Sequence, residues 1–113
     1  MKEKKQKNLA MFIFMVAILI ILFLLFYTPK TKATEELAKC IGLKAELYTQ
    51  LGCHACVTQE EMFGEYYEHL NVIDCFYERE RCGEIQYTPT WIIAGQKYTG
   101  VQELNKLKQL TDC

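Results

Sequence analysis

The sequence predicts an α/β fold, with a mixed sheet of about four strands flanked by helices, behind an N-terminal transmembrane helix. Three observations lead to this prediction. Residues 9–27 contain no charged side chain, and the segments after them alternate between helical and strand periodicity. Two cysteines separated by two residues, Cys53 and Cys56, stand where the first strand gives way to a helix. The chain of 113 residues has room for one folded domain and little else.

The uncharged segment is long enough to cross a bilayer, because a helix rises about 1.5 Å per residue and the hydrocarbon core is about 30 Å thick. A cleavable signal peptide is the alternative, since a basic stretch also precedes such peptides. Their apolar region usually has about 7–15 residues, however, and Thr31-Lys32-Ala33 is a poor cleavage site. We therefore expect an uncleaved anchor at 9–27, after a basic cytoplasmic tail at 1–8 and before a linker at 28–34 and a folded domain at 35–113.

The lysines that flank this segment predict its orientation. Four precede it and two closely follow it: Lys2, Lys4, Lys5 and Lys7, then Lys30 and Lys32. The positive-inside tendency places the N-terminus in the cytoplasm. All six cysteines follow the segment, which suits an oxidising compartment. We expect a single-pass protein of the cell membrane whose C-terminal domain is extracytoplasmic.

Charge and size limit the function further. Residues 28–113 hold nine Lys and Arg against thirteen Asp and Glu, a net charge of about −4 at pH 7. Because there is no basic stripe, we expect no nucleic-acid partner. A folded part this small is close to the lower limit for a self-sufficient hydrophobic core, so disulfides would help to stabilise it.

The first elements of the domain are a short helix and a short strand. Residues 35–41 are predicted as a helix that is capped by Thr34 and ended by Gly42. Residues 45–49 have the composition of a strand.

A longer helix then begins at Cys53 and runs to about Leu70, and Gly64 is expected to bend or divide it. Its apolar residues keep a spacing of three to four: Cys56, Phe63, Tyr67 and Leu70.

The remaining elements complete the predicted sheet. Residues 71–75 form a strand, residues 76–84 a short helix or loop, and residues 91–94 and 97–101 a hairpin around Gly95. Residues 103–110 form the closing helix. The first two strands are joined through a helix, which implies a parallel pair, and the hairpin adds an antiparallel pair.

The pair Cys53 and Cys56 has the spacing of a redox-active dithiol. Both sulfurs fall on one face of a helix start, close enough to form a disulfide. Free backbone N–H groups and the helix dipole favour the thiolate of Cys53, and thiolate is the attacking species. Cys53 is therefore the predicted nucleophile and Cys56 the resolving cysteine. His54 either stabilises the thiolate when protonated or faces solvent with little effect.

A zinc site is the alternative for these cysteines. A structural zinc ion needs four ligands, and Cys75 and Cys82 could complete a set. The six residues between them do not match the second tight knuckle of a zinc ribbon, so we expect no metal.

The order of elements, with Cys-x-x-Cys before a helix and a proline before the hairpin, resembles the thioredoxin fold. In that fold a cis-proline occupies the place of Pro89, and the backbone of Thr88 could then pair with an extended substrate strand. An ordinary trans-proline at the start of a strand is the alternative. Many thioredoxins keep a buried acid at the position of Leu47, while Glu46 should face the other side of the sheet.

A closer resemblance covers nearly the whole folded part. The chain is similar to the thioredoxin-like domain that accompanies bacterial and archaeal homologues of vitamin K epoxide reductase. The matching residues are Leu37-Ala38-Lys39-Cys40, Leu47-Tyr48, Gln59, Glu61-Met62-Phe63-Gly64, Asp74-Cys75, Cys82, Pro89-Thr90-Trp91-Ile92-Ile93 and Tyr98-Thr99-Gly100-Val101.

This resemblance implies an oxidising role. A quinone-linked membrane protein would reoxidise Cys53 and Cys56, which would then pass the disulfide to exported cysteine-containing proteins. The chain itself would need no cofactor. The chain departs from the family pattern at the site. The family's usual Cys-Pro-His-Cys is Cys-His-Ala-Cys here, so the family's reduction potential does not carry over, and Gly52 replaces the aromatic residue that is common before the first cysteine. The quinone-handling helices would come from a separate partner.

Four further cysteines are predicted to form structural disulfides. The resemblance and the short loop between them favour Cys75–Cys82. Cys40 and Cys113 lie near opposite ends of the folded part, and a bond between them would close a long loop. The alternative is a buried apolar Cys40 and a free Cys113.

Two other functions remain open from the sequence. One is a thiol reductase fed by a membrane reductant, and the other is a non-catalytic binding module stabilised by disulfides or zinc.

Overall fold

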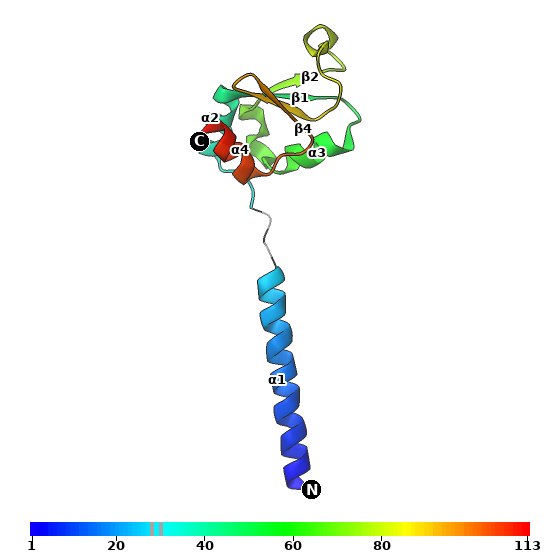
Figure 1. The fold of residues 1–113 in the computed structure, drawn as a ribbon, viewed down its shortest axis with the longest axis vertical. Coiled ribbons are helices and arrows are strands. Elements are labelled where there is room, and N and C mark those ends of the chain that lie inside the picture. The colour runs from blue at the N-terminus through cyan, green and yellow to red at the C-terminus, as the bar shows by residue number, and fades with distance from the viewer. Residues whose placement is uncertain (28, 30) are drawn as a thin grey trace. The chain divides into compact units, whose positions relative to one another are not determined.

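A computed structural model describes residues 1–27, 29 and 31–113 of the chain (Figure 1). The predicted linker includes Thr28 and Lys30, which lie outside the described residues. The chain divides into two compact units, Met1–Lys30 and Thr31–Cys113.

The first unit consists of helix α1 (Lys2–Phe26), which is 25 residues long. None of its described residues is buried. The helix is long and apolar enough to cross a membrane. The helix begins at Lys2, so it also includes the lysines of the predicted cytoplasmic tail at residues 1–8.

The second unit is built on a four-stranded mixed sheet with the order β2-β1-β3-β4. The strands are β1 (Ala45–Thr49), β2 (Asn71–Asp74), β3 (Thr90–Ile93) and β4 (Gln96–Thr99). Strand β1 is parallel to β2 and antiparallel to β3, and β4 pairs antiparallel with β3. The predicted fold class, a mixed sheet flanked by helices, is confirmed.

The helices share their hydrophobic core with one face of this sheet (Figure 1). They are α2 (Glu35–Lys44), α3 (His54–Glu61), the 3₁₀ helix η1 (Gly64–His69) and α4 (Leu104–Thr111). Strand alternation turns Leu47 and Trp91, which are cross-strand partners, into this core, where neither is exposed to solvent. Ile41 of α2 and Leu107 of α4 pack into the same core.

The opposite face of the sheet is covered in part by residues 75–89, which include the 3₁₀ helix η2 (Arg79–Cys82). Tyr48 and Ile73 are cross-strand partners on this face, and both are buried. Lys97 of β4 donates a hydrogen bond from Nζ to the Glu84 carbonyl oxygen at 2.9 Å. The segment therefore returns along this face before it reaches Pro89.

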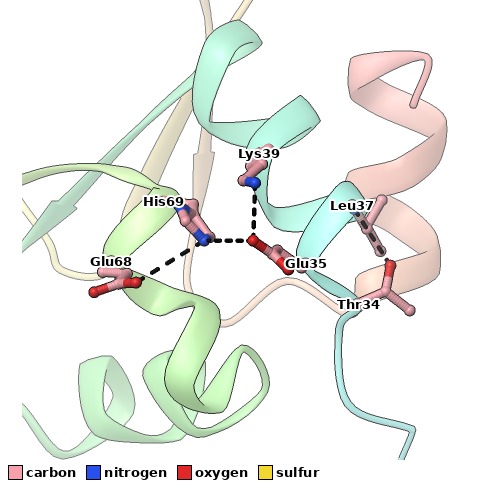
Figure 2. Close-up of polar contacts among 6 residues, drawn as sticks. All are labelled: Thr34, Glu35, Leu37, Lys39, Glu68 and His69. Atoms are coloured by element: carbon pink, nitrogen blue, oxygen red, sulfur yellow. Dashed lines mark hydrogen bonds and ion pairs between the residues drawn. The ribbon is translucent and has the colours of Figure 1, made fainter.

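Helix α2 begins as the sequence predicts but ends later. Thr34 is its N-cap, with the side chain accepting a hydrogen bond from Leu37 N at 3.3 Å (Figure 2). Gly42 does not end the helix, which continues to Lys44, so that prediction is wrong. The glycine instead allows a close approach, because a Cβ at this position would overlap the backbone carbonyl oxygen of His69.

Glu35 adds a polar connection between α2 and η1. Its carboxylate lies 2.8 Å from Lys39 Nζ and 3.6 Å from His69 Nε2 (Figure 2). The hydrogen bond with Lys39 lowers the pKa of Glu35 and raises that of Lys39.

The predicted helix at 53–70 is divided near Gly64, which has a φ of +56°. Helix α3 ends at Glu61, and η1 follows from Gly64 to His69. The other predicted strands and the closing helix keep their type and shift by one or two residues at their ends, as is usual for helix and strand boundaries.

Candidate active site

Cys53 and Cys56 lie at the start of α3, the helix that follows β1. Cys53 is the N-cap, with an extended backbone, and its Sγ accepts a hydrogen bond from Cys56 N at 3.2 Å. The two cysteines form a disulfide, with their Cα atoms 5.2 Å apart. Gly52, before the pair, has a φ of +85°, a conformation that L side chains rarely adopt. This turn allows the chain to leave β1 and enter α3 with Cys53 at the junction.

The two sulfurs differ in their access to solvent. Cys53 is half-buried, whereas Cys56 is only 6% exposed. A reagent or a protein thiol can therefore reach Cys53 more readily. The roles of Cys53 as the attacking and Cys56 as the resolving cysteine stay predictions, and this difference in access favours them.

The segment Thr88-Pro89 lies against the first cysteine. The Thr88 carbonyl oxygen is 3.5 Å from Cys53 Sγ, and the Thr88-Pro89 peptide bond is cis. Pro89 is buried, and its carbonyl oxygen accepts a hydrogen bond from Gly100 N at 2.7 Å. The structure thus brings together Cys53, Cys56, Thr88 and Pro89, which the sequence analysis proposed as one site.

His54 is the first residue of α3, and its side chain is exposed. The structure places it beside the cysteine pair but on the solvent side of the helix. This position fits the solvent-facing interpretation better than a fixed contact with the sulfur.

Asp74 is a residue of the site that the sequence analysis did not single out for a role. Its Oδ1 accepts hydrogen bonds from Leu51 N at 3.3 Å and Phe76 N at 2.9 Å. Cys75 N donates to the Thr49 carbonyl oxygen at 2.8 Å. The end of β2 therefore holds the loop that leads into Cys53. An Asp directly after a buried strand residue was the available signal.

Gln59 is a second such residue. It lies one helical turn after Cys56, and its side chain is fully buried in an otherwise apolar core. A polar residue on the predicted apolar stripe of the helix was the signal for it.

The position that often carries a buried acid in thioredoxins holds Leu47, which is fully buried. Its neighbour on the parallel strand is Val72, so this part of the core is apolar. Glu46 lies on the opposite face, where it accepts a hydrogen bond from Tyr48 Oη at 2.7 Å. That hydrogen bond, with burial, raises the pKa of Tyr48.

Tyr67 of η1 lies near the end of β1. Burial, together with the negative charge of Glu60, raises the pKa of Tyr67 to about 12, although a hydrogen bond with Thr49 acts in the opposite direction. The phenol is therefore neutral near pH 7.

The other four cysteines are paired as structural disulfides would be. Cys75 is bonded to Cys82 and Cys40 to Cys113, with Cα–Cα distances of 5.7 and 6.0 Å. Both distances lie in the range that disulfide geometry requires. The first bond closes the segment after β2, and the second joins α2 to Cys113, which lies two residues after the end of α4.

Comparison with known proteins gives a similarity to a thiol-disulfide oxidoreductase. No protein-family model matches the chain. The chain is 35% identical, over 95 residues, to the thiol-disulfide oxidoreductase LTO1 of Arabidopsis thaliana. The match covers 74% of this chain, and it spans 25% of the length of that relative. The similarity supports thiol–disulfide chemistry, to which the geometry of Cys53 and Cys56 is suited.

Proposed function

We propose that this protein is a thiol–disulfide oxidoreductase in which Cys53 and Cys56 are the redox pair. The observation that carries the proposal is the position of an accessible Cys53 at the start of α3, bonded to a buried Cys56 and next to Thr88. The similarity to a thiol-disulfide oxidoreductase supports the same reaction.

The proposed reaction is the transfer of a disulfide to a client protein. A client thiolate attacks Cys53 Sγ, the Cys53–Cys56 bond breaks, and Cys56 leaves with the electron pair and takes up a proton. A second client thiol then attacks the client sulfur of the mixed disulfide and releases Cys53. Two electrons and two protons have moved from the client to the cysteine pair.

The burial of Cys56 determines which of the two sulfurs a client thiolate attacks. Because Cys56 is nearly inaccessible, the client sulfur is expected to bond to Cys53. The Cys56 N–H group that lies 3.2 Å from Cys53 Sγ would stabilise negative charge on that sulfur when Cys53 is the leaving group.

We further propose that α1 anchors the protein in the cell membrane and that the domain faces the extracytoplasmic side. The length and apolarity of α1 support an anchor, and the lysines before it support the orientation. The clients would be exported cysteine-containing proteins. A membrane protein that resembles vitamin K epoxide reductase and is linked to quinone would take the two electrons and restore the disulfide.

Trapping of mixed disulfides in cells tests the redox role. In a Cys56→Ala variant, Cys53 has no internal partner to release a bound protein, so covalent complexes should accumulate that disappear on reduction. A Cys53→Ala variant is the matched control and should give none. Equal complexes from both variants would contradict the assignment of Cys53.

The topology needs a separate experiment. A membrane-impermeant maleimide should label Cys53 of the Cys56→Ala variant in intact cells. A cysteine introduced by Lys5→Cys should become labelled only after the membrane is permeabilised. The reverse pattern would overturn the proposed orientation.

The equilibrium with glutathione tests the direction of electron flow. An oxidase should have a reduction potential well above the roughly −270 mV of thioredoxin. A potential at or below that value would favour the reductase that the sequence left open.

A further inference from the structure

The buried side chain of Gln59 connects three segments that surround the candidate active site. It is 0% exposed, yet each end of its amide has partners. Oε1 accepts hydrogen bonds from Trp91 Nε1 at 3.0 Å and from Gln102 N at 2.7 Å. Nε2 donates to the Gln102 carbonyl oxygen at 3.1 Å and lies 3.4 Å from Met62 Sδ.

These contacts determine the orientation of the amide. Trp91 and the Gln102 backbone N–H are donors, so they require the oxygen of Gln59. The Gln102 carbonyl accepts, so it requires the nitrogen. A reversed amide would place donor against donor on one side and acceptor against acceptor on the other. Gln59 is therefore matched to this place in the core by hydrogen bonding as well as by shape.

Two routes lead from Gln59 to Pro89. The first runs through Trp91, which lies on β3 two residues after Pro89. The second runs through the backbone of Gln102, because the same loop donates a hydrogen bond from Gly100 N to the Pro89 carbonyl oxygen at 2.7 Å. The Gln102 side chain stiffens this loop by donating to the carbonyl oxygens of Thr99 and Gly100, both at 3.2 Å.

The connection closes a ring of contacts around the cysteines. Cys56 and Gln59 are one turn apart on α3, and Gln59 is joined to Pro89 by the two routes described. Thr88, directly before Pro89, has its carbonyl oxygen 3.5 Å from Cys53 Sγ. Gln59 is thus linked to both sides of the contact between the redox pair and the Thr88-Pro89 segment, in addition to the direct pairing of β1 with β3.

We propose that Gln59 is a positioning residue that holds the Cys53–Cys56 helix against the Thr88-Pro89 segment, so that a bound polypeptide meets Cys53 in the reactive geometry. This inference rests on the proposed function. It deepens that function by naming a residue that acts through others, since Gln59 is buried and touches no substrate. The loss of the amide should impair reaction with an extended peptide, which needs both Thr88 and Cys53, more than reaction with a small thiol, which needs only Cys53.

The test uses the full-length oxidised protein in detergent micelles. The rate at which the Cys53–Cys56 disulfide opens is measured with a cysteine-containing decapeptide and with dithiothreitol, by alkylation and mass spectrometry. In a Gln59→Met variant, which keeps the volume and loses the hydrogen bonds, the ratio of peptide rate to dithiothreitol rate should fall by about tenfold or more, because small misplacements of reacting groups cost large factors in rate.

Leu107→Ala is the matched control, because Leu107 is a fully buried core residue on α4 whose apolar side chain takes no part in the hydrogen bonds of Gln59. It should lower stability while leaving the rate ratio within about twofold of the wild type. A Gln59→Met ratio no lower than that of the control would overturn the positioning role.

A second variant covers the case in which Gln59→Met does not fold. Trp91→Phe keeps an aromatic ring in the core and removes the indole N–H together with part of the ring volume, and it should lower the rate ratio in the same direction by a smaller factor. An unchanged ratio in Trp91→Phe would then overturn the proposal. A different result would contradict the proposed function itself. In the wild-type protein, the peptide would then open the Cys53–Cys56 disulfide no faster than the Cys75–Cys82 disulfide.

Discussion

Cys53 and Cys56 belong to the same helix start but occupy different environments. The first sulfur is half-buried and accepts a backbone hydrogen bond, and the second is nearly inaccessible. Local sequence was sufficient to indicate this difference, because the N-cap position and the next turn of the helix follow from a spacing of three.

The difference predicts the order in which the reduced cysteines react. At mildly acidic pH, iodoacetamide should modify Cys53 first, because its thiolate is stabilised by free N–H groups at the helix start and its sulfur is accessible. Peptide mapping by mass spectrometry after brief alkylation measures the order. Faster modification of Cys56 would show that the two roles are reversed.

Tyr67 makes a prediction at alkaline pH. Its pKa is raised to about 12, from an ordinary value near 10, mainly by burial. The neutral phenol is therefore favoured in the folded state. Its contribution to stability is complete below about pH 10 and is lost as the pH rises through about 12.

Absorbance titration of tyrosine ionisation checks this prediction. Tyr67→Phe should remove one tyrosine from the group that ionises near pH 12 and leave the earlier-ionising tyrosines unchanged. If the number that ionises near pH 12 is the same in both proteins, burial of Tyr67 is not the cause of the late ionisation.

The hydrogen-bond partners of Gln59 and Asp74 could not be predicted from the sequence. The cysteine pair depends on contacts between near neighbours, so its spacing carries the signal. The partners of Gln59 are 32 and 43 positions away, and Asp74 binds Leu51 from 23 positions away. No local pattern specifies such pairs, because they depend on which segments the fold places side by side.

Among the elements, α2 and η1 show how packing overrides a local stop signal. Gly42 follows a short amphipathic segment and therefore predicts the end of a helix, yet α2 continues to Lys44. The glycine is required by the close approach of the His69 carbonyl, which belongs to an element that comes 27 positions later. In contrast, the Thr34 cap is confirmed, since a cap and its N–H partner are neighbours in sequence.

Gly42→Ala should therefore destabilise the protein. In a solvent-exposed helix interior this change normally stabilises by about 0.5–1 kcal/mol. Here the added Cβ would overlap the His69 carbonyl oxygen, so α2 and η1 must separate, at a cost of roughly 1–3 kcal/mol. Urea unfolding of the full chain in detergent micelles measures the change. A variant as stable as the wild type or more stable would show that the two helices are not held this closely.

At the scale of the whole domain, the predicted order of elements matches the structure because the apolar patterns change period at each element. Two short-range rules account for two of the pairings in the sheet, the parallel pair β1 and β2 joined by a helix and the hairpin of β3 and β4. The antiparallel pairing of β1 with β3, which completes the order β2-β1-β3-β4, joins segments far apart in the sequence and was not predicted. The packing of residues 75–89 over the second face was not predicted, since this polar segment has no periodic pattern.

The Cys40–Cys113 disulfide should contribute strongly to the stability of this small domain. It joins residues 73 positions apart, whereas Cys75–Cys82 spans 7. In the chain-entropy model the long loop is worth roughly 4 kcal/mol and the short one about 2–3 kcal/mol. Replacing Cys40 and Cys113 together by serine should lower the free energy of unfolding more than replacing Cys75 and Cys82 together. Urea unfolding compares the two variants, and the opposite ranking would contradict this assignment of stability.

The function proposed for this protein requires that the Cys53–Cys56 disulfide can be passed to another protein. The most direct test mixes the oxidised full-length protein in detergent micelles with a reduced, unfolded protein that contains two cysteines, and counts the disulfides formed in the substrate by alkylation and mass spectrometry. We predict one disulfide transferred per chain, with Cys53 and Cys56 recovered as thiols and the bonds Cys40–Cys113 and Cys75–Cys82 intact. A Cys53→Ser variant should transfer none. A substrate that remains fully reduced, or a disulfide transferred equally well by the Cys53→Ser variant, would show that Cys53 and Cys56 are not the redox pair.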